Sequence, residues 1–255
     1  MSDLALKQAT LEYATRLGDD SVILGHRLSE WCSNAPFLEE DLALANVALD
    51  YIGRARMYYT YAAELANDGR TEDDFAYRRN EREYRNLLIN ELPRGDFAHT
   101  IIRQLLMDVF NKHFLTQLMQ SKDETLAAIA AKAIKETRYH LRRSTEWTLR
   151  LGGGTDESHR RTQRALESLW GYTHELFDVD ATEQRLADEG IGVNNPALRP
   201  QWLKEISEIV AEATLTLPAD SWAVRGGRVG YHTENLGHIL TEMQFVHRSY
   251  PRQQW

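Results

Sequence analysis

The sequence predicts an all-α protein, a four-helix bundle with additional C-terminal helices, from three observations. Apolar residues recur at helical spacing almost throughout the chain, and no segment alternates as a β-strand does. Hydrophobic residues make up 42% of the sequence and charged residues 27%, with six prolines, which indicates a folded chain. The 255 residues show no repeat and no linker, so a single domain over residues 1–255 is expected.

Two long helices are expected first. One spans residues 4–32, with Gly18 as the expected point of a kink. Residues 34–36 end it, and the acidic residues that follow favour a second helix at 38–66, because the dipole favours negative charge in a first turn. Both faces of this helix are apolar between residues 42 and 52, so it is expected to be buried.

Caps and glycines delimit the remaining helices. Thr71 and Asp74 have capping-box spacing, which predicts a charged helix that ends before Pro93. Asp96 can cap the next helix, which is expected to end at about residue 121. The helix that follows is expected to end at three glycines, residues 152–154. The later helices are expected at 124–151, 156–177, 180–189, 199–215 and 232–249.

Composition argues against several functions. The net charge of −8 is unlike that of a nucleic-acid-binding protein, which needs a basic face. Cys32 is the only cysteine, which excludes an internal disulfide and a multi-thiolate zinc site. No apolar run approaches the ~20 residues of a membrane span, and the N-terminus lacks an apolar signal core. We therefore expect a cytoplasmic protein that binds neither nucleic acid nor membrane.

A di-iron site is the function that such a bundle suggests, yet its motif is missing. A four-helix bundle that holds two irons uses a Glu-x-x-His turn on two helices, and no Glu in this chain precedes a His by three residues. Glu136 is best interpreted as a solvated partner of Lys132, and His140 as a hydrogen-bonded core residue at the margin of an apolar face. Asp96 and Asp156 each precede a histidine, His99 and His159, by the three residues typical of metal ligands. Both aspartates lie at predicted helix starts, where aspartate more often caps the helix or interacts favourably with the helix dipole.

Several segments together form a specific combination that extends from about residue 10 to the end of the chain. They are Arg16-Leu17-Gly18-Asp19-Asp20, Leu28-Ser29-Glu30-Trp31-Cys32, Asp41-Leu42-Ala43-Leu44-Ala45-Asn46, Tyr61-Ala62-Ala63-Glu64-Leu65, Ala131-Lys132-Ala133-Ile134-Lys135-Glu136, Arg138-Tyr139-His140-Leu141-Arg142, His232-Thr233-Glu234-Asn235-Leu236-Gly237 and Gln253-Gln254-Trp255. This combination resembles the C subunits of ring 1,2-phenylacetyl-CoA epoxidases, which are bacterial multicomponent oxygenases.

The resemblance implies a ferritin-like fold and a role in aerobic phenylacetate degradation. In that family a sister A subunit holds the di-iron centre and epoxidises the aromatic ring, and a separate flavin and iron–sulfur reductase delivers electrons from NADPH. The C subunit is an iron-free companion that stabilises the A subunit. The expectation for this chain is therefore no catalytic residue and no cofactor of its own, with the catalytic di-iron A subunit as its partner.

Similarity between the sister subunits also gives a register for the lost metal site. In this register Tyr51 and Arg54 replace one Glu/His pair, and Thr137 and His140 occupy the other. One histidine and an arginine cannot hold two iron ions, which need several carboxylates to offset their charge. We expect Asp50, Tyr51, Arg54 and His140 to form a buried hydrogen-bonded network in the former cavity.

The partner interface is expected on the first two helices. Aromatic and methionine side chains, which are enriched at interface centres, cluster near their ends. The residues expected at this interface are Trp31, Met57, Tyr58, Tyr59 and Tyr61. Without its partner, the chain is expected to form a homodimer through the same surface.

Two alternatives stay open from the sequence. One is a free-standing helical oxygenase with an unorthodox ligand set drawn from His26, Glu30, Asp50, Asp108 and His140. The other is a helical adaptor unrelated to oxygen chemistry, which would require the family resemblance to be coincidental.

Overall fold

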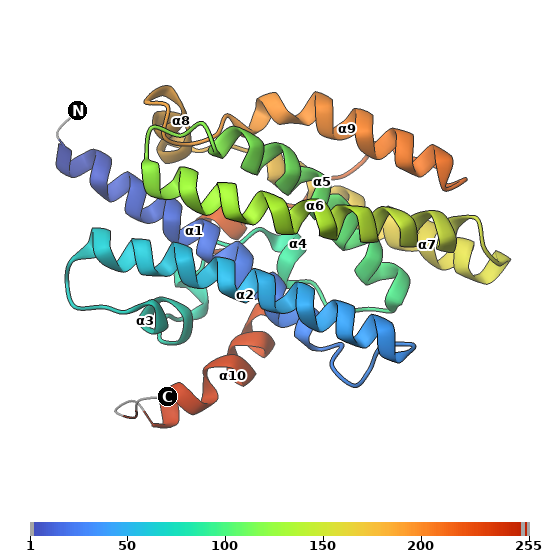
Figure 1. Ribbon diagram of the computed structural model, residues 1–255, viewed down its shortest axis with the longest axis horizontal. Helices are drawn as coiled ribbons and strands as arrows, with labels where there is room; N and C mark the ends of the chain where they lie inside the picture. The colour runs from blue at the N-terminus through green and yellow to red at the C-terminus, as the bar shows by residue number, and fades with distance from the viewer. Residues whose placement is uncertain (1–2, 251–252, 254–255) are drawn as a thin grey trace. The chain divides into compact units, whose positions relative to one another are not determined.

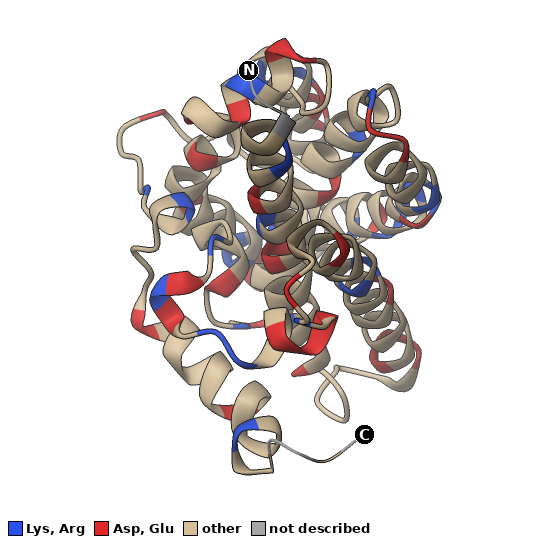
Figure 2. Ribbon diagram, turned by 90° about the vertical axis from the view of Figure 1, so that its left-hand side faces the viewer, with Lys and Arg blue, Asp and Glu red and all other residues tan. Residues whose placement is uncertain are grey.

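The protein is all-helical in a computed structural model that describes residues 3–250 and 253 (Figure 1). Ten α-helices and three short 3-10 helices make up about 75% of the structure, and no strand occurs among these described residues. Lys and Arg are interspersed with Asp and Glu along the helices visible in Figure 2. The prediction of an all-α protein with additional C-terminal helices is confirmed.

The chain divides into two compact units. One consists of Met1–Pro93 with Arg225–Trp255, and the other of Arg94–Val224. Each unit contains one pair of long helices. The expectation of a single domain over residues 1–255 stays a prediction.

In the first unit, α1 (Asp3–Ser29) and α2 (Leu38–Ala66) form an antiparallel hairpin (Figure 1). Both helices begin and end close to their predicted limits. Gly18 allows them to approach, because a Cβ there would lie 2.4 Å from the ring of Tyr59 on α2. The glycine that was expected to kink α1 therefore accommodates an aromatic ring from the neighbouring helix.

The prediction of one charged helix from residue 71 to Pro93 is wrong. The capping box at Thr71 is present, but α3 (Glu72–Tyr77) ends after six residues. A 3-10 helix (Glu81–Glu83) and the short α4 (Leu88–Glu91) follow. Two backbone amides between them donate to carboxylates of α1 instead of continuing a helix, at 2.8 Å for Arg85 and 2.7 Å for Leu87.

The segment that returns to this unit near the C-terminus contains a 3-10 helix (Gly227–Val229) and α10 (Glu234–Ser249). In the first unit, α10 packs against α1, α3 and α4. Residues distant in sequence thus share one core, which includes Val22, Tyr59, Phe75, Tyr84 and Leu240.

In the second unit, α5 (Phe97–Leu118) and α6 (Glu124–Gly152) form the other antiparallel pair (Figure 1). Asp96 caps α5 by accepting the backbone N–H of His99 at 2.9 Å, as the sequence predicts. The glycine stop of α6 is also confirmed. A Cβ at Gly152 would lie 2.2 Å from the carbonyl oxygen of Ala213, so a larger residue would not fit there.

The rest of this unit is built from α7 (Asp156–Trp170), a 3-10 helix (Gly171–Phe177), α8 (Ala181–Asp188) and α9 (Asn195–Glu212). The predicted helix at 156–177 thus changes to 3-10 geometry after Trp170. The indole of Trp202 on α9 donates to the carbonyl of Leu106 at 3.0 Å, which attaches α9 to α5. None of the described helices is both long and apolar enough to cross a membrane.

Candidate site and docking surface

The positions on α2 that would correspond to metal ligands hold side chains of the wrong chemistry. Tyr51 and Arg54 are both buried. The guanidinium carbon of Arg54 lies 4.8 Å from the centroid of the Tyr51 ring, at cation–π distance. Asp50, the neighbouring acid, is partly exposed. A guanidinium stays protonated at any physiological pH, so this position carries a fixed positive charge where a metal cation would have to bind.

The corresponding positions on α6 lie in the core. Thr137 and His140 are buried, so His140 belongs to the buried face rather than its margin. One turn further along, the hydroxyl of Ser144 donates to the carboxylate of Asp108 on α5 at 2.8 Å. This bond between fully buried groups connects the two long helices of the second unit. The predicted network of Asp50, Tyr51, Arg54 and His140 stays a prediction.

The donor set does not fit a di-iron centre. Over residues 3–250 and 253, no three His, Cys, Asp or Glu side chains lie close enough together to hold one metal ion. Two irons held by a helical bundle need several carboxylates together with histidines.

Two carboxylates of the alternative ligand set accept hydrogen bonds within the chain. Glu30 accepts a hydrogen bond from Arg27 at 2.5 Å, and Asp108 accepts one from Ser144. Burial lowers the pKa of His26 to about 4, so its imidazole is neutral at physiological pH. His159, which is not in this set but has ligand spacing with Asp156, lies with Nδ1 2.8 Å from the carbonyl oxygen of Gly152.

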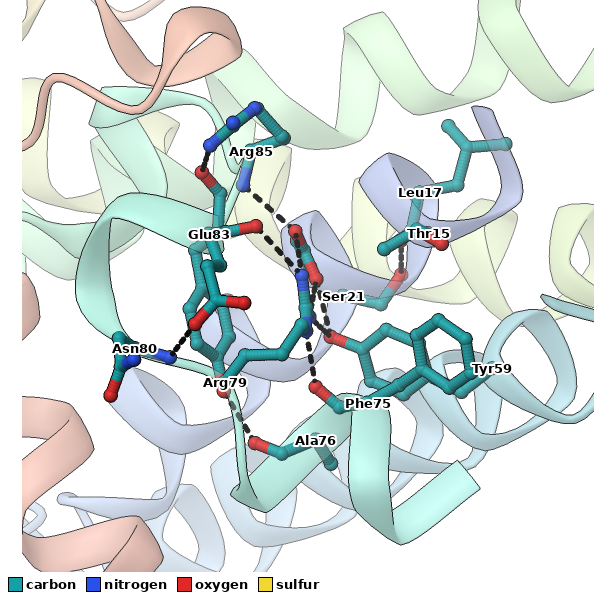
Figure 3. A network of polar contacts seen from close by, with 12 residues as sticks. Thr15, Leu17, Ser21, Tyr59, Phe75, Ala76, Arg79, Asn80, Glu83 and Arg85 are labelled. Carbon is teal, nitrogen blue, oxygen red and sulfur yellow. Dashed lines mark hydrogen bonds and ion pairs between the residues drawn. The ribbon is translucent and has the colours of Figure 1, made fainter. Parts of the chain in front are cut away.

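A buried polar network in the first unit was not predicted from the sequence. Asp19, which is fully buried on α1, accepts the hydroxyl of Tyr59 at 2.7 Å and the backbone N–H of Arg85 at 2.8 Å. It also accepts hydrogen bonds from both terminal nitrogens of Arg79 and forms an ion pair with it. Figure 3 shows Tyr59, Arg79 and Arg85 in this network. The signal in the sequence was the pair of acids Asp19 and Asp20 within an apolar helix.

A second carboxylate, that of Glu91, organises the end of this segment. It accepts hydrogen bonds from Asn86 at 2.9 Å and from the backbone of Thr233 at 2.6 Å, and it contacts His232 at 2.8 Å. The guanidinium of Arg27 donates to the Glu91 carbonyl at 2.8 Å. These bonds hold three separate parts of the first unit together, which is a structural role.

Three of the five residues predicted for the partner interface are core residues. Trp31, Tyr58 and Tyr59 are only 5%, 2% and 1% exposed, and Met57 and Tyr61 are partly buried. The side chains of these three residues are buried within the chain itself, so the prediction that they lie on an exposed docking surface is wrong. Sequence alone did not reveal which face of each helix the neighbouring helix covers.

A different face of α2 is apolar and exposed. Leu38, Leu42 and Leu49 are 69%, 57% and 64% exposed, which contradicts the prediction that both faces of this helix are buried. Ala45 and Ile52, both partly exposed, continue the series, in which successive residues are three or four positions apart. This spacing places all five on one side of the helix. We call these residues the α2 stripe: Leu38, Leu42, Ala45, Leu49 and Ile52.

The helical architecture, with a long antiparallel pair in each unit, is consistent with the ferritin-like class of proteins. The family model described as phenylacetic acid catabolic protein matches residues 2–255, and the chain belongs to this family. The C subunit of 1,2-phenylacetyl-CoA epoxidase from Escherichia coli (strain K12) is 50% identical over 243 residues, which cover 95% of this chain and 98% of that protein. The resemblance seen in the sequence is confirmed.

Proposed function

We propose that this chain is the structural subunit of a phenylacetyl-CoA epoxidase in aerobic phenylacetate catabolism, and that it holds no di-iron centre of its own. One observation carries the proposal: Tyr51, Arg54 and Thr137 occupy three of the four expected ligand positions, and among the described residues no cluster replaces them. The Escherichia coli relative is a subunit of this enzyme, which supports the assignment to the complex.

The proposed partner is the catalytic subunit that holds the di-iron centre, with a flavin and iron–sulfur reductase supplying electrons. The α2 stripe supports this part of the proposal. Contiguous exposed apolar surface is rare on monomers and marks association sites. In the absence of the catalytic subunit, a second copy of this chain is the expected occupant of the stripe, which gives a homodimer.

Metal analysis tests the catalytic part of the proposal. The chain, expressed alone in iron-rich medium, is expected to contain no stoichiometric iron, and the catalytic subunit prepared in parallel is the positive control. About two irons per chain, the number in a di-iron centre, would contradict the proposal and favour the free-standing oxygenase with unorthodox ligands.

Charge substitutions on the stripe test the docking part. Leu42→Glu and Leu49→Glu are expected to abolish co-purification with the catalytic subunit while the circular dichroism spectrum stays helical, because a carboxylate in an apolar interface must be desolvated. Leu4→Glu, at an exposed leucine of α1, is the matched control and is expected to co-purify normally. Tyr58 is unsuitable for this test because it is buried, so that a charge there would perturb folding.

If the Leu42→Glu and Leu49→Glu variants bind as well as the Leu4→Glu control, the α2 stripe is not the docking surface. The exposed aromatic residues Trp222 and Tyr231 would then be the next to test.

A further inference from the structure

The α2 stripe leads into a hollow of the first unit. The hollow has a volume of about 400 Å³ and is lined by residues of α1, α2, α3 and α10. Ile52, the last residue of the stripe, is also one of the residues at the hollow. Ligand pockets range from ~300 to 1,000 Å³, so this space lies at the lower end of that range and is large enough for one long side chain.

The lining of the hollow combines small apolar groups, aromatic rings and charged groups. Buried Val22, Ala55 and Ala76 contribute small apolar groups, and Tyr59 also lines the hollow. Tyr77 of α3 stacks on His247 of α10, with ring centroids 4.2 Å apart and planes 2° from parallel. A side chain entering here would meet surfaces suited to methylene groups and to a flat, positively charged group.

The charged groups of the hollow are two carboxylates and one guanidinium. Glu72 and Asp73 come from the first turn of α3, and Arg56 comes from α2. Arg56 Nε lies 3.4 Å from Glu72 Oε1, and the Arg56 side chain is 74% exposed. An ion pair this exposed contributes little and can be exchanged for another. Burial, with a smaller effect from the charge of Asp73, raises the pKa of Tyr77, so Asp73 acts electrostatically on a ring of the hollow.

We propose that this hollow receives an arginine side chain from a helix of the catalytic subunit that lies along the α2 stripe. The inference rests on the proposed function, since it names what the partner presents to the same surface. Residues 38, 42, 45, 49 and 52 alternate spacings of four and three, the heptad pattern through which one helix packs against another. A helix in that position reaches the hollow where the stripe ends at Ile52.

Arginine satisfies both parts of the hollow. Its aliphatic stem can lie on the apolar groups of the lining, and its planar guanidinium can bind a carboxylate through two parallel hydrogen bonds and stack on a ring. The first unit already contains such a contact nearby, because the guanidinium carbon of Arg70 lies 4.5 Å from the centroid of the Phe75 ring. The excess carboxylate at the hollow supplies the charge complementarity.

The test compares two double variants of the full chain in complex with the catalytic subunit. Glu72→Gln/Asp73→Asn removes the carboxylates of the hollow, and Glu64→Gln/Glu242→Gln removes two exposed carboxylates outside it. Affinity for the catalytic subunit is measured at low and high salt. We expect the hollow variant to bind roughly tenfold more weakly at low salt, and the difference from wild type to shrink at high salt. The control variant is expected to bind within about twofold of wild type.

The inference is overturned if the hollow variant binds like the control variant while Leu42→Glu and Leu49→Glu still abolish binding. That result would leave the proposed docking surface intact and remove only the arginine anchor. If the two leucine variants also bind normally, the docking surface itself is wrong. Circular dichroism checks that the hollow variant remains folded, because its two acids lie in the first turn of α3.

Discussion

His232 and Glu91 form a buried pair in which the imidazole has an acceptor at each ring nitrogen. Nδ1 of His232 lies 2.8 Å from Oε2 of Glu91, and Nε2 lies 3.0 Å from the carbonyl oxygen of Tyr84. Both side chains are fully buried. A neutral imidazole has one N–H, so donation to both acceptors requires the protonated ring. The pair therefore attaches the C-terminal segment to α4 by a charged contact.

The first prediction concerns this contact. His232→Ala should lower the free energy of unfolding by about 3 kcal/mol, because it leaves the Glu91 carboxylate buried without its cation. The measurement is urea unfolding, with His238→Ala, at an exposed histidine of the adjacent helix α10, as the control. Equal stabilities of the two variants would show that the pair contributes nothing.

The same contact predicts a pH dependence. Burial lowers the pKa of His232, but the hydrogen bond and charge of Glu91 outweigh it and raise the pKa above its usual value. The stabilisation is thus complete below the unfolded-state pKa of ~6.5 and is lost as pH rises through the folded-state pKa. The difference in unfolding free energy between wild type and His232→Ala should therefore shrink in alkaline solution.

His26 should act in the opposite direction. Burial lowers its pKa to about 4, so its contribution is present above ~6.5 and is lost as pH falls toward the folded-state pKa. Between neutral pH and pH ~5, His26→Leu should lose about 1–2 kcal/mol less stability than wild type. His238→Leu is the control and should keep the wild-type pH dependence; the same loss in His26→Leu would contradict the prediction.

Two substitutions around Asp19 should differ in cost. Tyr59→Phe removes one hydrogen bond to Asp19 and should cost roughly 1–2 kcal/mol. Arg79→Met removes the cation paired with a fully buried carboxylate and should cost about 3–5 kcal/mol. Chemical denaturation of both variants and of the double variant measures their coupling, and strictly additive costs would argue against a shared network.

Two helical glycines should respond in opposite ways to alanine. A Cβ at Gly18 would lie 2.4 Å from the Tyr59 ring, whereas one at Gly53 meets nothing within 4 Å. Gly18→Ala should destabilise the chain by about 1–3 kcal/mol through overpacking. Gly53→Ala should stabilise it by roughly 0.5–1 kcal/mol, since alanine loses less backbone entropy in a helix. Thermal unfolding of both variants would reveal a shift of the same sign if close approach at Gly18 is unimportant.

His140→Ala separates a structural role from a catalytic one. The side chain is buried, so its removal should cost roughly 1–3 kcal/mol of stability. The oxygenase activity of the assembled complex should stay within a few-fold of wild type if no chemistry passes through His140. A thousandfold loss of activity in an intact complex would make His140 catalytic.

Local sequence determined the long helices and several of their ends. Helical periodicity placed α1, α2, α5 and α6, because an amphipathic pattern over 20 or more residues has few other solutions. The helix caps at Thr71 and Asp96 and the end of α6 at Gly152 could also be predicted, since a cap is a contact between residues close in sequence. The missing Glu-x-x-His turns could be read in the same way.

Only the tertiary structure decided the segment after α3 and the choice of exposed face. The backbone of residues 85 and 87 pairs with Asp19 and Asp20, more than sixty residues earlier, so local propensity could not place it. Likewise, Tyr58 and Leu42 lie on one apolar helix, yet one is buried and the other exposed. Apolar periodicity identifies which residues can be buried, but the position of the neighbouring helices determines which of them are.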